Sequence, residues 1–382
     1  MVMKLLSRLL IIFLFVAILG IVIAYARGYR FDFQNKGFSS TGIIAITSVP
    51  KTSKIYLNDH LKGVTDANLT LAPGKYKIEI KKEGFTSWLK NVNLKGELVV
   101  NLDVLLYPIN PSLSPLTNLG VIKAVPLQDD NKVVVFTEEG IYLFETARRP
   151  LSFFPPLKTL VKKELFPEDL DFSKVEVLIS PDQKQAIVDN YLISLEEENQ
   201  SILDLSLSKE SKQTLISAWE EQKRENFLKI LETYPADLAK IASDSFKVIS
   251  FSPTETKVLY QSKTDISLPP MITPPLIVTN QTPENRSLKK GGYYIYDKKE
   301  DKNYEISNTS SIFWYFDSRH LVVEEDRKIS IVDYDNSNRQ AVYSGPFEAN
   351  FFTTTSDGKI IVLANLNPEG NKLPDLYLVG IR

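Results

Sequence analysis

Apolar and polar positions alternate along residues 42–106, where short apolar runs are separated by Gly, Pro and Asn. In the stretch LAPGKYKIEIKKEGF, Tyr76, Ile78 and Ile80 share one face, and the charged residues between them share the other. This period of two is typical of a half-buried strand. Several such runs within the segment predict a small antiparallel β-sandwich.

A second pattern repeats along residues 117–382. Each copy has an apolar strand, a polar turn, a second apolar strand and an aromatic strand, as in ISPDQKQAIVDNYLISLEE and TTSDGKIIVLANL. Five copies can be recognised, and two insertions account for their uneven spacing. A repeat of about 40–45 residues is typical of four-stranded propeller blades. The segment therefore predicts a β-propeller of about five blades, and the fold class is mainly β.

The first insertion, residues 208–244, has the pattern of helices. Its apolar residues recur at steps of three or four positions, or at multiples of these steps. Pro235 suits the start of a second helix. Because the apolar residues form a stripe, we expect one face of this helical insertion to be buried against the propeller.

The second insertion, residues 266–290, contains five prolines and separates two strands of one blade. Met271, Ile272, Leu276 and Ile277 lie among these prolines. An extended, proline-rich segment can recognise a partner at low entropic cost, so these four residues form a candidate binding loop. We expect the loop to be dispensable for folding; a surface loop without function is the alternative.

The N-terminal segment differs from the rest of the chain. Residues 1–26 carry Lys4 and Arg8 and then no charge from Leu9 to Ala26. A spanning helix needs ~20 mostly apolar residues, so this segment predicts a transmembrane signal-anchor with the following domains exported. Cleavage after Ala26, as in a signal peptide, is the alternative.

Two connecting segments complete the predicted organisation. Residues 27–41 are expected to form a short stem after the anchor. Residues 107–116 contain three prolines and predict a semi-rigid linker between the sandwich and the propeller. The linker should therefore separate two units that fold independently.

Composition excludes several kinds of chemistry. The chain has 382 residues, no cysteine, two histidines and a formal net charge of −2. Without cysteine, disulfides, thiolate nucleophiles and Cys-ligated metals are excluded. Basic residues are dispersed among acidic ones, so nucleic acid is not an expected partner. No catalytic or nucleotide-binding motif occurs. We expect no enzymatic activity and no cofactor.

Two short stretches could carry chemistry, and each has a simpler interpretation. His320 begins the stretch HLVVEED and is expected to be a neutral, partly buried structural residue, and His60 is expected in a turn of the sandwich. The string DYDNSN, which begins at Asp333, is similar to the opening of a calcium-binding loop. Asn338 and Ser344 stand where such a loop needs Gly and Glu, so a solvated turn is expected instead.

Two motifs stand out in the predicted sandwich, Leu-x-Pro-Gly-x-Tyr and Glu-Gly-Phe, and a tryptophan follows them. Their residues here include Pro73, Gly74, Tyr76, Gly84, Phe85 and Trp88. In this order they resemble the PEGA domain, a small exported β-sandwich module, over residues 43–107. Pro73 and Gly74 can form a tight turn in which the glycine takes a positive φ. The three aromatic residues are expected in the core, with glycan stacking by Trp88 as the alternative.

The turns of the predicted propeller also carry a resemblance. Ser180-Pro181-Asp182, Ser252-Pro253-Thr254 and Ser356-Asp357-Gly358 precede the second strand of three repeats. These turns resemble the TolB-like, WD-type propeller repeat. The whole order of anchor, PEGA module and propeller resembles PEGA-domain membrane proteins of uncultivated small-genome bacteria. The resemblance implies no particular biochemical role.

These expectations point to a non-enzymatic protein of the cell envelope, held by one membrane pass with its domains outside the cytoplasm. The PEGA module would be a spacer or a cell-wall contact, and the propeller would bind an envelope protein or a glycan. A glycan-active enzyme is one alternative and would need carboxylates that converge in the funnel. A small-ligand receptor is another and would need a funnel lined by aromatic residues.

Overall fold

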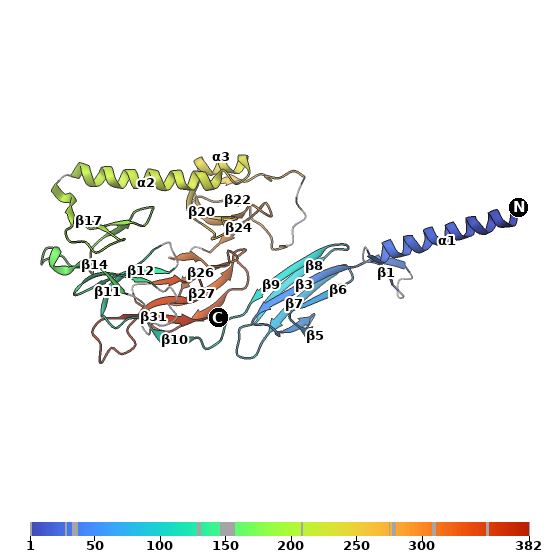
Figure 1. Cartoon of the computed structure of the whole chain (residues 1–382), viewed down its shortest axis with the longest axis horizontal. Helices are drawn as coiled ribbons and strands as arrows, with labels where there is room; N and C mark the ends of the chain where they lie inside the picture. Colours follow the sequence, from blue (N-terminus) through green and yellow to red (C-terminus); the bar gives the residue numbers. More distant parts are fainter. Residues whose placement is uncertain are drawn as a thin grey trace. The chain divides into compact units, whose positions relative to one another are not determined.

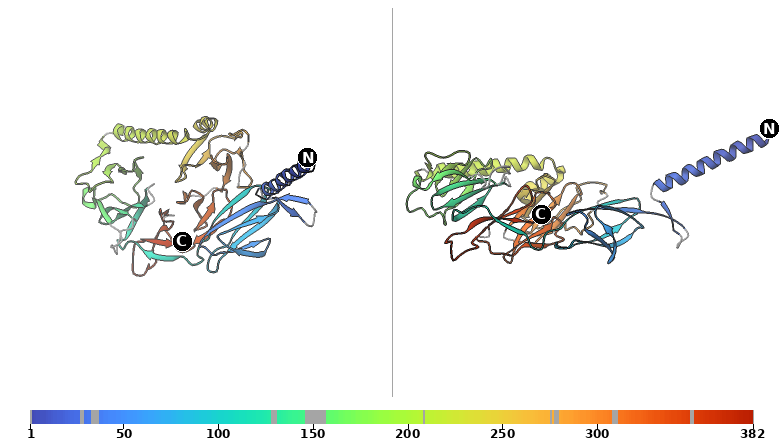
Figure 2. Two further views of the ribbon diagram at one scale, coloured as in Figure 1. Left: turned by 45° about the vertical axis from the view of Figure 1, so that its right-hand side comes forward. Right: turned by 60° about the horizontal axis from the view of Figure 1, so that its bottom comes forward.

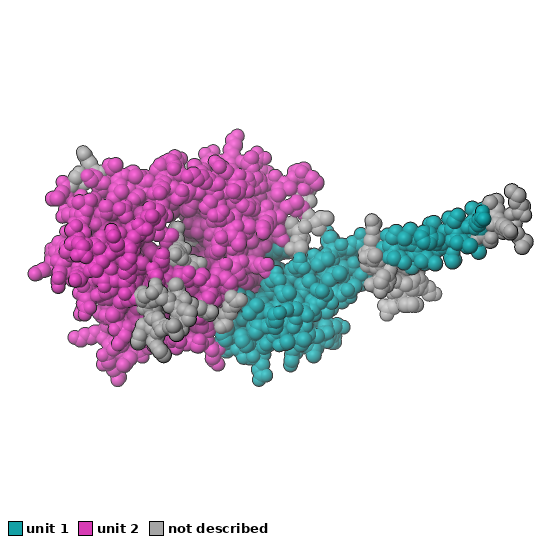
Figure 3. Space-filling model, in the orientation of Figure 1, with its two compact units in different colours: residues 1–109, 277–281 teal, residues 110–276, 282–382 magenta. Residues whose placement is uncertain are grey.

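The computed structural model of the chain contains two compact units. It describes residues 2–26, 29–32, 37–127, 131–145, 157–207, 209–274, 276, 280–307, 311–348 and 351–381. Unit 1 comprises residues 1–109 and 277–281, and unit 2 comprises residues 110–276 and 282–382 (Figure 3). The two units are described separately.

Unit 1 begins with a helix, α1 (Val2–Ala26). Large apolar side chains from Leu9 to Ile23 are all exposed on its surface. Within the described part of the chain, no helix has both the length and the apolar character needed to cross a membrane. The short strands β1 (Tyr29–Asp32) and β2 (Gly37–Ser40) pair antiparallel in the segment expected to be a stem.

A two-layer β-sandwich follows. One sheet has the order β6-β3-β9, and the other has the order β5-β4-β7-β8. The strands are β3 (Gly42–Val49), β4 (Lys54–Leu57), β5 (His60–Val64), β6 (Ala67–Leu71), β7 (Gly74–Lys81), β8 (Trp88–Leu94) and β9 (Val99–Leu105). The expectation of an antiparallel sandwich is corrected at one place, because β3 and β9 are parallel. The chain changes sheets between β8 and β9 and so arrives beside β3 in the same direction.

The core of the sandwich lies between its two sheets. Alternate residues of β7 and β9 are buried, which confirms the period-2 interpretation, and Ile78 and Ile80 are fully buried. Ile44, Ile46, Trp88 and other residues from both sheets pack with them in one cluster. Burial of an aliphatic side chain of this size contributes about 1.5–3 kcal/mol, so this cluster stabilises the sandwich.

Unit 2 contains, among its described residues, five four-stranded antiparallel sheets, which we call blades 1 to 5 (Figures 1 and 2). Blade 1 is β11 (Val121–Pro126), β12 (Lys132–Thr137), β13 (Gly140–Glu145) and β14 (Leu157–Lys162). Blade 2 is β15 (Val177–Ile179), β16 (Gln185–Val188), β17 (Tyr191–Ser194) and β18 (Leu203–Asp204). Blade 3 is β19 (Phe246–Phe251), β20 (Lys257–Ser262), β23 (Tyr293–Asp297) and β24 (Lys302–Ile306). Blade 4 is β25 (Ile312–Trp314), β26 (His320–Glu325), β27 (Lys328–Asp333) and β28 (Gln340–Tyr343).

Blade 5 joins the two ends of unit 2. It combines β29 (Phe352–Thr354), β30 (Ile360–Ala364) and β31 (Asp375–Gly380) with β10 (Ser112–Pro115), in the order β10-β31-β30-β29. β10 pairs antiparallel with β31 from Ser112↔Gly380 to Pro115↔Tyr377. The segment expected to be a proline-rich linker therefore supplies the strand that closes the ring. Pro115 can occupy this place because β10 is the edge strand of its sheet, where a missing N–H costs little.

Neighbouring blades pack face to face in most of the ring. One buried cluster joins blades 1 and 2, a second joins blades 5 and 1, and a third joins blades 3 and 4. Blades 4 and 5 meet through the rings of Phe313 and Phe352, whose centroids are 5.1 Å apart. Among the described residues, none of these clusters joins blade 2 to blade 3.

The helical insertion lies between blades 2 and 3. It forms α2 (Lys209–Leu231) and α3 (Ala236–Ser245), with Pro235 directly before α3 as predicted. α3 packs on blade 3, where Leu238 and Ala242 join a cluster that includes Tyr260 and Tyr294. Figures 1 and 2 show α2 reaching from the region of β17 to the region of β20. The prediction that one face is buried is met by α3 and the ends of α2, whereas residues 220–226 are exposed on every side.

The proline-rich insertion is held at both ends. Its short strands β21 (Ile266–Ser267) and β22 (Ser287–Leu288) pair with each other. Leu268 and Leu288 are buried in the cluster of blade 3. Asp301 accepts hydrogen bonds from the backbone N of Met271 (2.9 Å) and Ile272 (3.0 Å). The two ends of this loop are therefore anchored to blade 3.

Candidate functional site

Four blades contain the same type of turn. It joins β15 to β16, β19 to β20, β25 to β26 and β29 to β30. The fourth residue of each turn has a positive φ: 58° for Gln183, 53° for Glu255, 61° for Ser318 and 80° for Gly358. Its backbone N donates to the carbonyl of the first turn residue, which is Ser180, Ser252, Tyr315 or Thr355. The predicted Ser-Pro-Asp turns are thus confirmed in blades 2, 3 and 5. Blade 4 has the same geometry without the sequence motif.

The first strands of the blades converge where these turns lie. Residues of β11, β19, β25 and β29, from four different blades, line one cavity of about 650 Å³. Because one strand from each of these blades reaches the same cavity, it lies at the centre of the ring, and we call it the central cavity. Phe227 and Ile230 of α2 also line the central cavity, so the helical insertion covers part of it.

The central cavity combines aromatic and neutral polar side chains. Phe251, Phe313 and Trp314 supply rings from blades 3 and 4. The polar lining residues include Asn131, Ser250, Ser252, Thr353, Thr354 and Ser356. Of the described residues that line the cavity, only Glu255 carries a charge, and it is exposed. Cavities of about 300–1,000 Å³ with this mixture are typical of small-molecule sites.

Two hydroxyl groups that line the central cavity, and one enclosed nitrogen atom, lack a partner among the described residues. Trp314 is 7% exposed, and its buried Nε1 makes no hydrogen bond. The hydroxyl groups of Ser250 and Thr353 also have no hydrogen-bond partner within that part of the chain, and Thr353 is 6% exposed. Trp314 Nε1 is enclosed by protein, where a donor without a partner costs about 1–3 kcal/mol, and a ligand in the cavity does not reach it. The two hydroxyl groups are not enclosed in this way, so they can bind a ligand.

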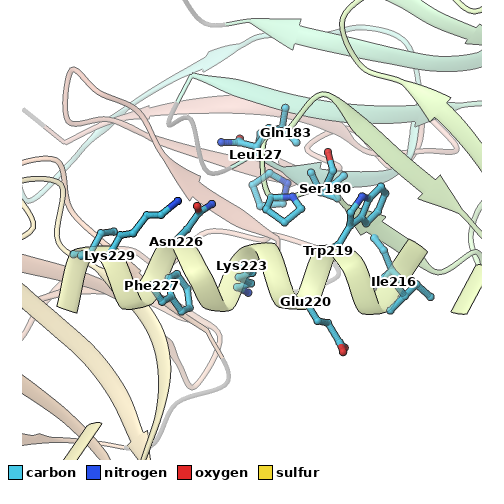
Figure 4. A pocket seen from close by; sticks show the side chains of 15 residues that line it. Leu127, Ser180, Gln183, Ile216, Trp219, Glu220, Lys223, Asn226, Phe227 and Lys229 are labelled. Atoms are coloured by element: carbon cyan, nitrogen blue, oxygen red, sulfur yellow. The ribbon is translucent and has the colours of Figure 1, made fainter. Parts of the chain in front are cut away.

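A second cavity lies under α2, and we call it the α2 cavity. It has a volume of about 740 Å³ and lies between α2 and the turn region of blades 1 and 2. Trp219 and Asn226 point from the helix toward Leu127 and Ser180, whereas Glu220 points away (Figure 4). The two cavities adjoin, because Pro126, Leu127, Phe227 and Ile230 line both.

Among the described residues, the hydrogen bonds and ring contacts that join α2 to the blades lie near its two ends. Near its start, Lys212 Nζ donates to Asp189 O (2.7 Å) and Asn190 Oδ1 (2.8 Å) in blade 2. Near its end, Phe227 packs edge-on against Phe251, with centroids 5.6 Å apart, and Leu231 is buried on blade 3. The central part therefore spans the distance between two blades.

His320 was expected to be neutral and partly buried, and the structure corrects both points. It is 6% exposed and lies between two carboxylates, with Nδ1 2.6 Å from Asp317 Oδ2 and Nε2 3.2 Å from Asp333 Oδ1. Burial lowers the pKa of His320, but the hydrogen bonds with the two aspartates outweigh it and raise the pKa to about 10. The ring is therefore charged at neutral pH and belongs to a buried ion cluster. His60 begins β5 and is exposed.

The calcium-like string is a turn. Asp333 Oδ2 accepts from Asn338 Nδ2 (2.9 Å) and Ser337 Oγ (3.2 Å). Asp335 accepts from Ser337 and from Thr282 Oγ1 (2.5 Å), and it is buried rather than solvated as expected. Within the residues that the structure describes, no group of His, Asp and Glu is arranged to hold a metal ion.

The six residues of the PEGA-like motifs lie in the sandwich. Trp88 is buried, and Tyr76 and Phe85 pack on the same cluster half-buried, which agrees with the core interpretation. Gly84 has a φ of 78°, as a turn glycine requires. Gly74 does not have a positive φ, so the expected reason for a glycine after Pro73 is not found there. The Asn58–Asp59 turn instead takes positive φ at both residues.

The four residues of the candidate binding loop have different environments. Met271 and Ile272 are half-buried, Leu276 is exposed, and Ile277 lies outside the described residues. In unit 1, Gln281 from the end of this loop forms two hydrogen bonds with the backbone of Asn93 on β8, of 2.6 and 2.8 Å. These two bonds occupy backbone groups on the free edge of β8.

The lining of the central cavity was not identified from the sequence. The signal was nevertheless present, since Ser250, Trp314 and Thr353 lie one or two positions before a blade turn. What the sequence could not show is that these positions from different blades meet.

A comparison with protein families identifies one domain of the chain. Residues 41–110 match the family profile of the PEGA domain, which supports the resemblance found in this part of the sequence. No curated protein matches the chain significantly. The family match does not bear on a membrane location or on the group of bacteria that the resemblance implied.

Among solved structures, similarity is weak. A putative TolB from Agrobacterium tumefaciens is 10% identical, covers 73% of this chain and 74% of its own, and has a TM-score of 0.22. The AfRom2 CNH domain is 11% identical, with 79% and 90% covered and a TM-score of 0.24. Hsv2 from Kluyveromyces lactis is 10% identical, with 89% and 98% covered and a TM-score of 0.17. At these TM-scores the similarities support no assignment of function.

Proposed function

We propose that this is a non-enzymatic binding protein of the cell envelope in which the ring of unit 2 carries the ligand site. The central cavity is the observation that supports the proposal most directly. It is lined by strands of four blades, contains aromatic rings and neutral polar groups, and has two hydroxyl groups, on Ser250 and Thr353, without a partner in the described protein. Rigid blades hold such a lining in place, which reduces the entropic cost of binding.

The PEGA domain and α1 would place this site at the envelope. In the proposal, the sandwich is a spacer or a contact to the cell wall, and α1 attaches the protein to a membrane with the domains outside the cytoplasm. The exposed apolar side chains from Leu9 to Ile23 support attachment, because apolar surface of this extent is unfavourable in water.

The attachment can be tested by fractionation. The full chain should sediment with membranes and remain there in high salt, whereas a variant without residues 1–26 should be found in the soluble fraction. A full chain that is soluble, or a truncated chain that stays with membranes, would contradict attachment by α1.

The binding role of unit 2 can be tested by retention of envelope components. The chain without residues 1–26, immobilised, should retain a molecule from an envelope extract, and Ser250→Phe should abolish retention by filling the central cavity. Lys247→Phe changes an exposed residue of the same strand and is the matched control. Equal retention by the wild type and the Ser250→Phe variant would place the function elsewhere.

A glycan-active enzyme is the second candidate, and the charges of the cavity argue against it. Glycoside hydrolysis generally uses two carboxyl groups on either side of the bond that is broken. Of the described residues that line the central cavity, Glu255 alone has a carboxyl group. If the protein nevertheless releases sugar from envelope polymers, and Glu255→Gln abolishes this activity, the enzyme interpretation replaces the binding one.

A further inference from the structure

The central cavity has chemical features that restrict what it can bind. The restriction comes from three properties that do not depend on one another: the charge of the lining, the kinds of hydrogen-bonding group that lack a partner, and the presence of aromatic rings. This inference rests on the proposed binding function of unit 2 and adds the class of ligand.

The charge of the lining favours a neutral ligand. Among the described residues of the central cavity there is no Lys, Arg or His, and the one carboxylate, on Glu255, is exposed at the blade turn. A charged ligand that entered the cavity would lose its hydration without gaining a partner of opposite charge, at a cost of several kcal/mol.

The groups without a partner favour a ligand that both donates and accepts hydrogen bonds. The hydroxyl groups of Ser250 and Thr353 can each donate and accept. They come from blades 3 and 5, so they reach the cavity from two directions. A molecule with hydroxyl groups on several sides can satisfy both at the same time.

The remaining lining is aromatic. Phe227, Phe251 and Phe313 line the cavity together with Trp314. The negative faces of such rings attract weakly positive C–H groups. Sugars combine C–H faces with hydroxyl edges, whereas a peptide strand presents its hydrogen-bonding groups along two edges only.

We propose that the central cavity binds a neutral saccharide, in contact with the hydroxyl groups of Ser250 and Thr353 and with the aromatic rings of the lining. The volume of about 650 Å³ is sufficient for a short oligosaccharide. Phe227 and Ile230 of α2 cover part of the bound sugar.

The experiment measures binding of maltotriose, cellotriose and tri-N-acetylchitotriose to the full chain by isothermal titration calorimetry. Tetra-alanine and a trimer of galacturonic acid represent the peptide and acidic alternatives. At least one neutral sugar should bind, and Thr353→Val, which removes a hydroxyl group with little change of shape, should weaken it by about tenfold, the loss of one hydrogen bond. Ser250→Ala should also weaken it.

Thr137→Val is the matched control, because Thr137 is also a buried strand residue but does not line the central cavity. It should leave the affinity unchanged. The proposal is wrong if none of the neutral sugars binds at millimolar concentration, if Thr353→Val binds as tightly as the wild type, or if tetra-alanine or the acidic trimer binds better. The two assays together distinguish the two proposals. If no sugar binds, but the chain retains an envelope component and Ser250→Phe abolishes that retention, the saccharide proposal is wrong and the proposed binding function stands.

Discussion

At the scale of single residues, backbone conformation decides which glycines matter. Gly358 has a φ of 80°, and an added Cβ would lie 2.6 Å from Phe316 Cε1 and 2.7 Å from Tyr315 OH. Gly74 lies at the start of β7 without a positive φ, and the nearest atoms to an added Cβ are 3.8 Å away. The sequence alone suggested the opposite order of importance, since Gly74 belongs to the more specific motif.

The first prediction compares these two glycines. Gly358→Ala should lower the free energy of unfolding by more than about 1 kcal/mol, because both the positive φ and the close contacts oppose a side chain. Gly74→Ala should change it by less than about 0.5 kcal/mol. Urea denaturation of both variants measures the difference. Equal losses would mean that the turn of blade 5 tolerates a side chain.

The second prediction concerns the charge of His320. His320→Gln leaves Asp317 and Asp333 buried without the cation between them. The free energy of unfolding should therefore fall by about 3–5 kcal/mol at neutral pH. The exposed His60→Gln is the control and should have no effect.

The pH dependence of this difference follows from the pKa of His320. Its folded value of about 10 exceeds the unfolded value of about 6.5, so the contribution is complete below pH 6.5 and decreases as pH rises through 10. The advantage of the wild type over His320→Gln should therefore diminish between these two pH values. A constant difference in urea denaturation from pH 6 to pH 10 would contradict a charged His320.

At the scale of elements, the two insertions have different relations to the ring. α3 takes the place of a neighbouring blade on one face of blade 3, and α2 crosses to blade 2 with its middle exposed. The proline-rich loop is anchored by Leu268, Leu288 and Arg286, which forms an ion pair with the buried Asp301 at 3.2 Å. Both insertions therefore contribute to the stability of blade 3.

The third prediction separates the anchored and free parts of this loop. Replacing residues 266–290 with a Gly-Ser bridge should lower the melting temperature strongly, because loss of each buried leucine costs about 2–5 kcal/mol. Replacing residues 273–279 alone should leave the melting temperature nearly unchanged. Differential scanning calorimetry of both variants tests this, and an unchanged melting temperature after the longer replacement would show that the anchoring contacts are unimportant.

At the scale of the whole molecule, ring closure determines where the chain can be divided. β10 belongs to unit 2 although it precedes the repeats, and Thr117 and Leu119 continue the closure by hydrogen bonds to Asp375 Oδ1 of 2.9 and 2.8 Å. Leu106 and Tyr107 are buried in unit 1. The division therefore falls between residues 109 and 110.

The fourth prediction follows from this boundary. Residues 42–109 should unfold cooperatively when expressed alone, and so should residues 110–382. Residues 117–382 lack β10 and expose the edge of β31, so this fragment should melt at a lower temperature and associate. Circular dichroism melts and size-exclusion chromatography compare the fragments. Identical behaviour of the two longer fragments would mean that β10 does not close the ring.

The sequence by itself determined the elements and their repetition. Alternation in β7 and the turn motifs before β16, β20 and β30 are local patterns, and local conformation follows from the residues in and around them. The same reasoning identified the helical insertion and the PEGA-like sandwich, whose core residues Ile78 and Trp88 are buried as the pattern predicts.

Only the tertiary structure decided which distant residues meet. The pairing of β10 with β31, the parallel pairing of β3 with β9, and the meeting of Ser250, Trp314 and Thr353 in one cavity depend on the closure of whole sheets. The charge of His320 depends in the same way on Asp333, which pairs with it across two strands. Such contacts depend on the packing free energy of the complete fold. A short segment of sequence does not contain the residues that determine this free energy, so local patterns cannot predict the contacts.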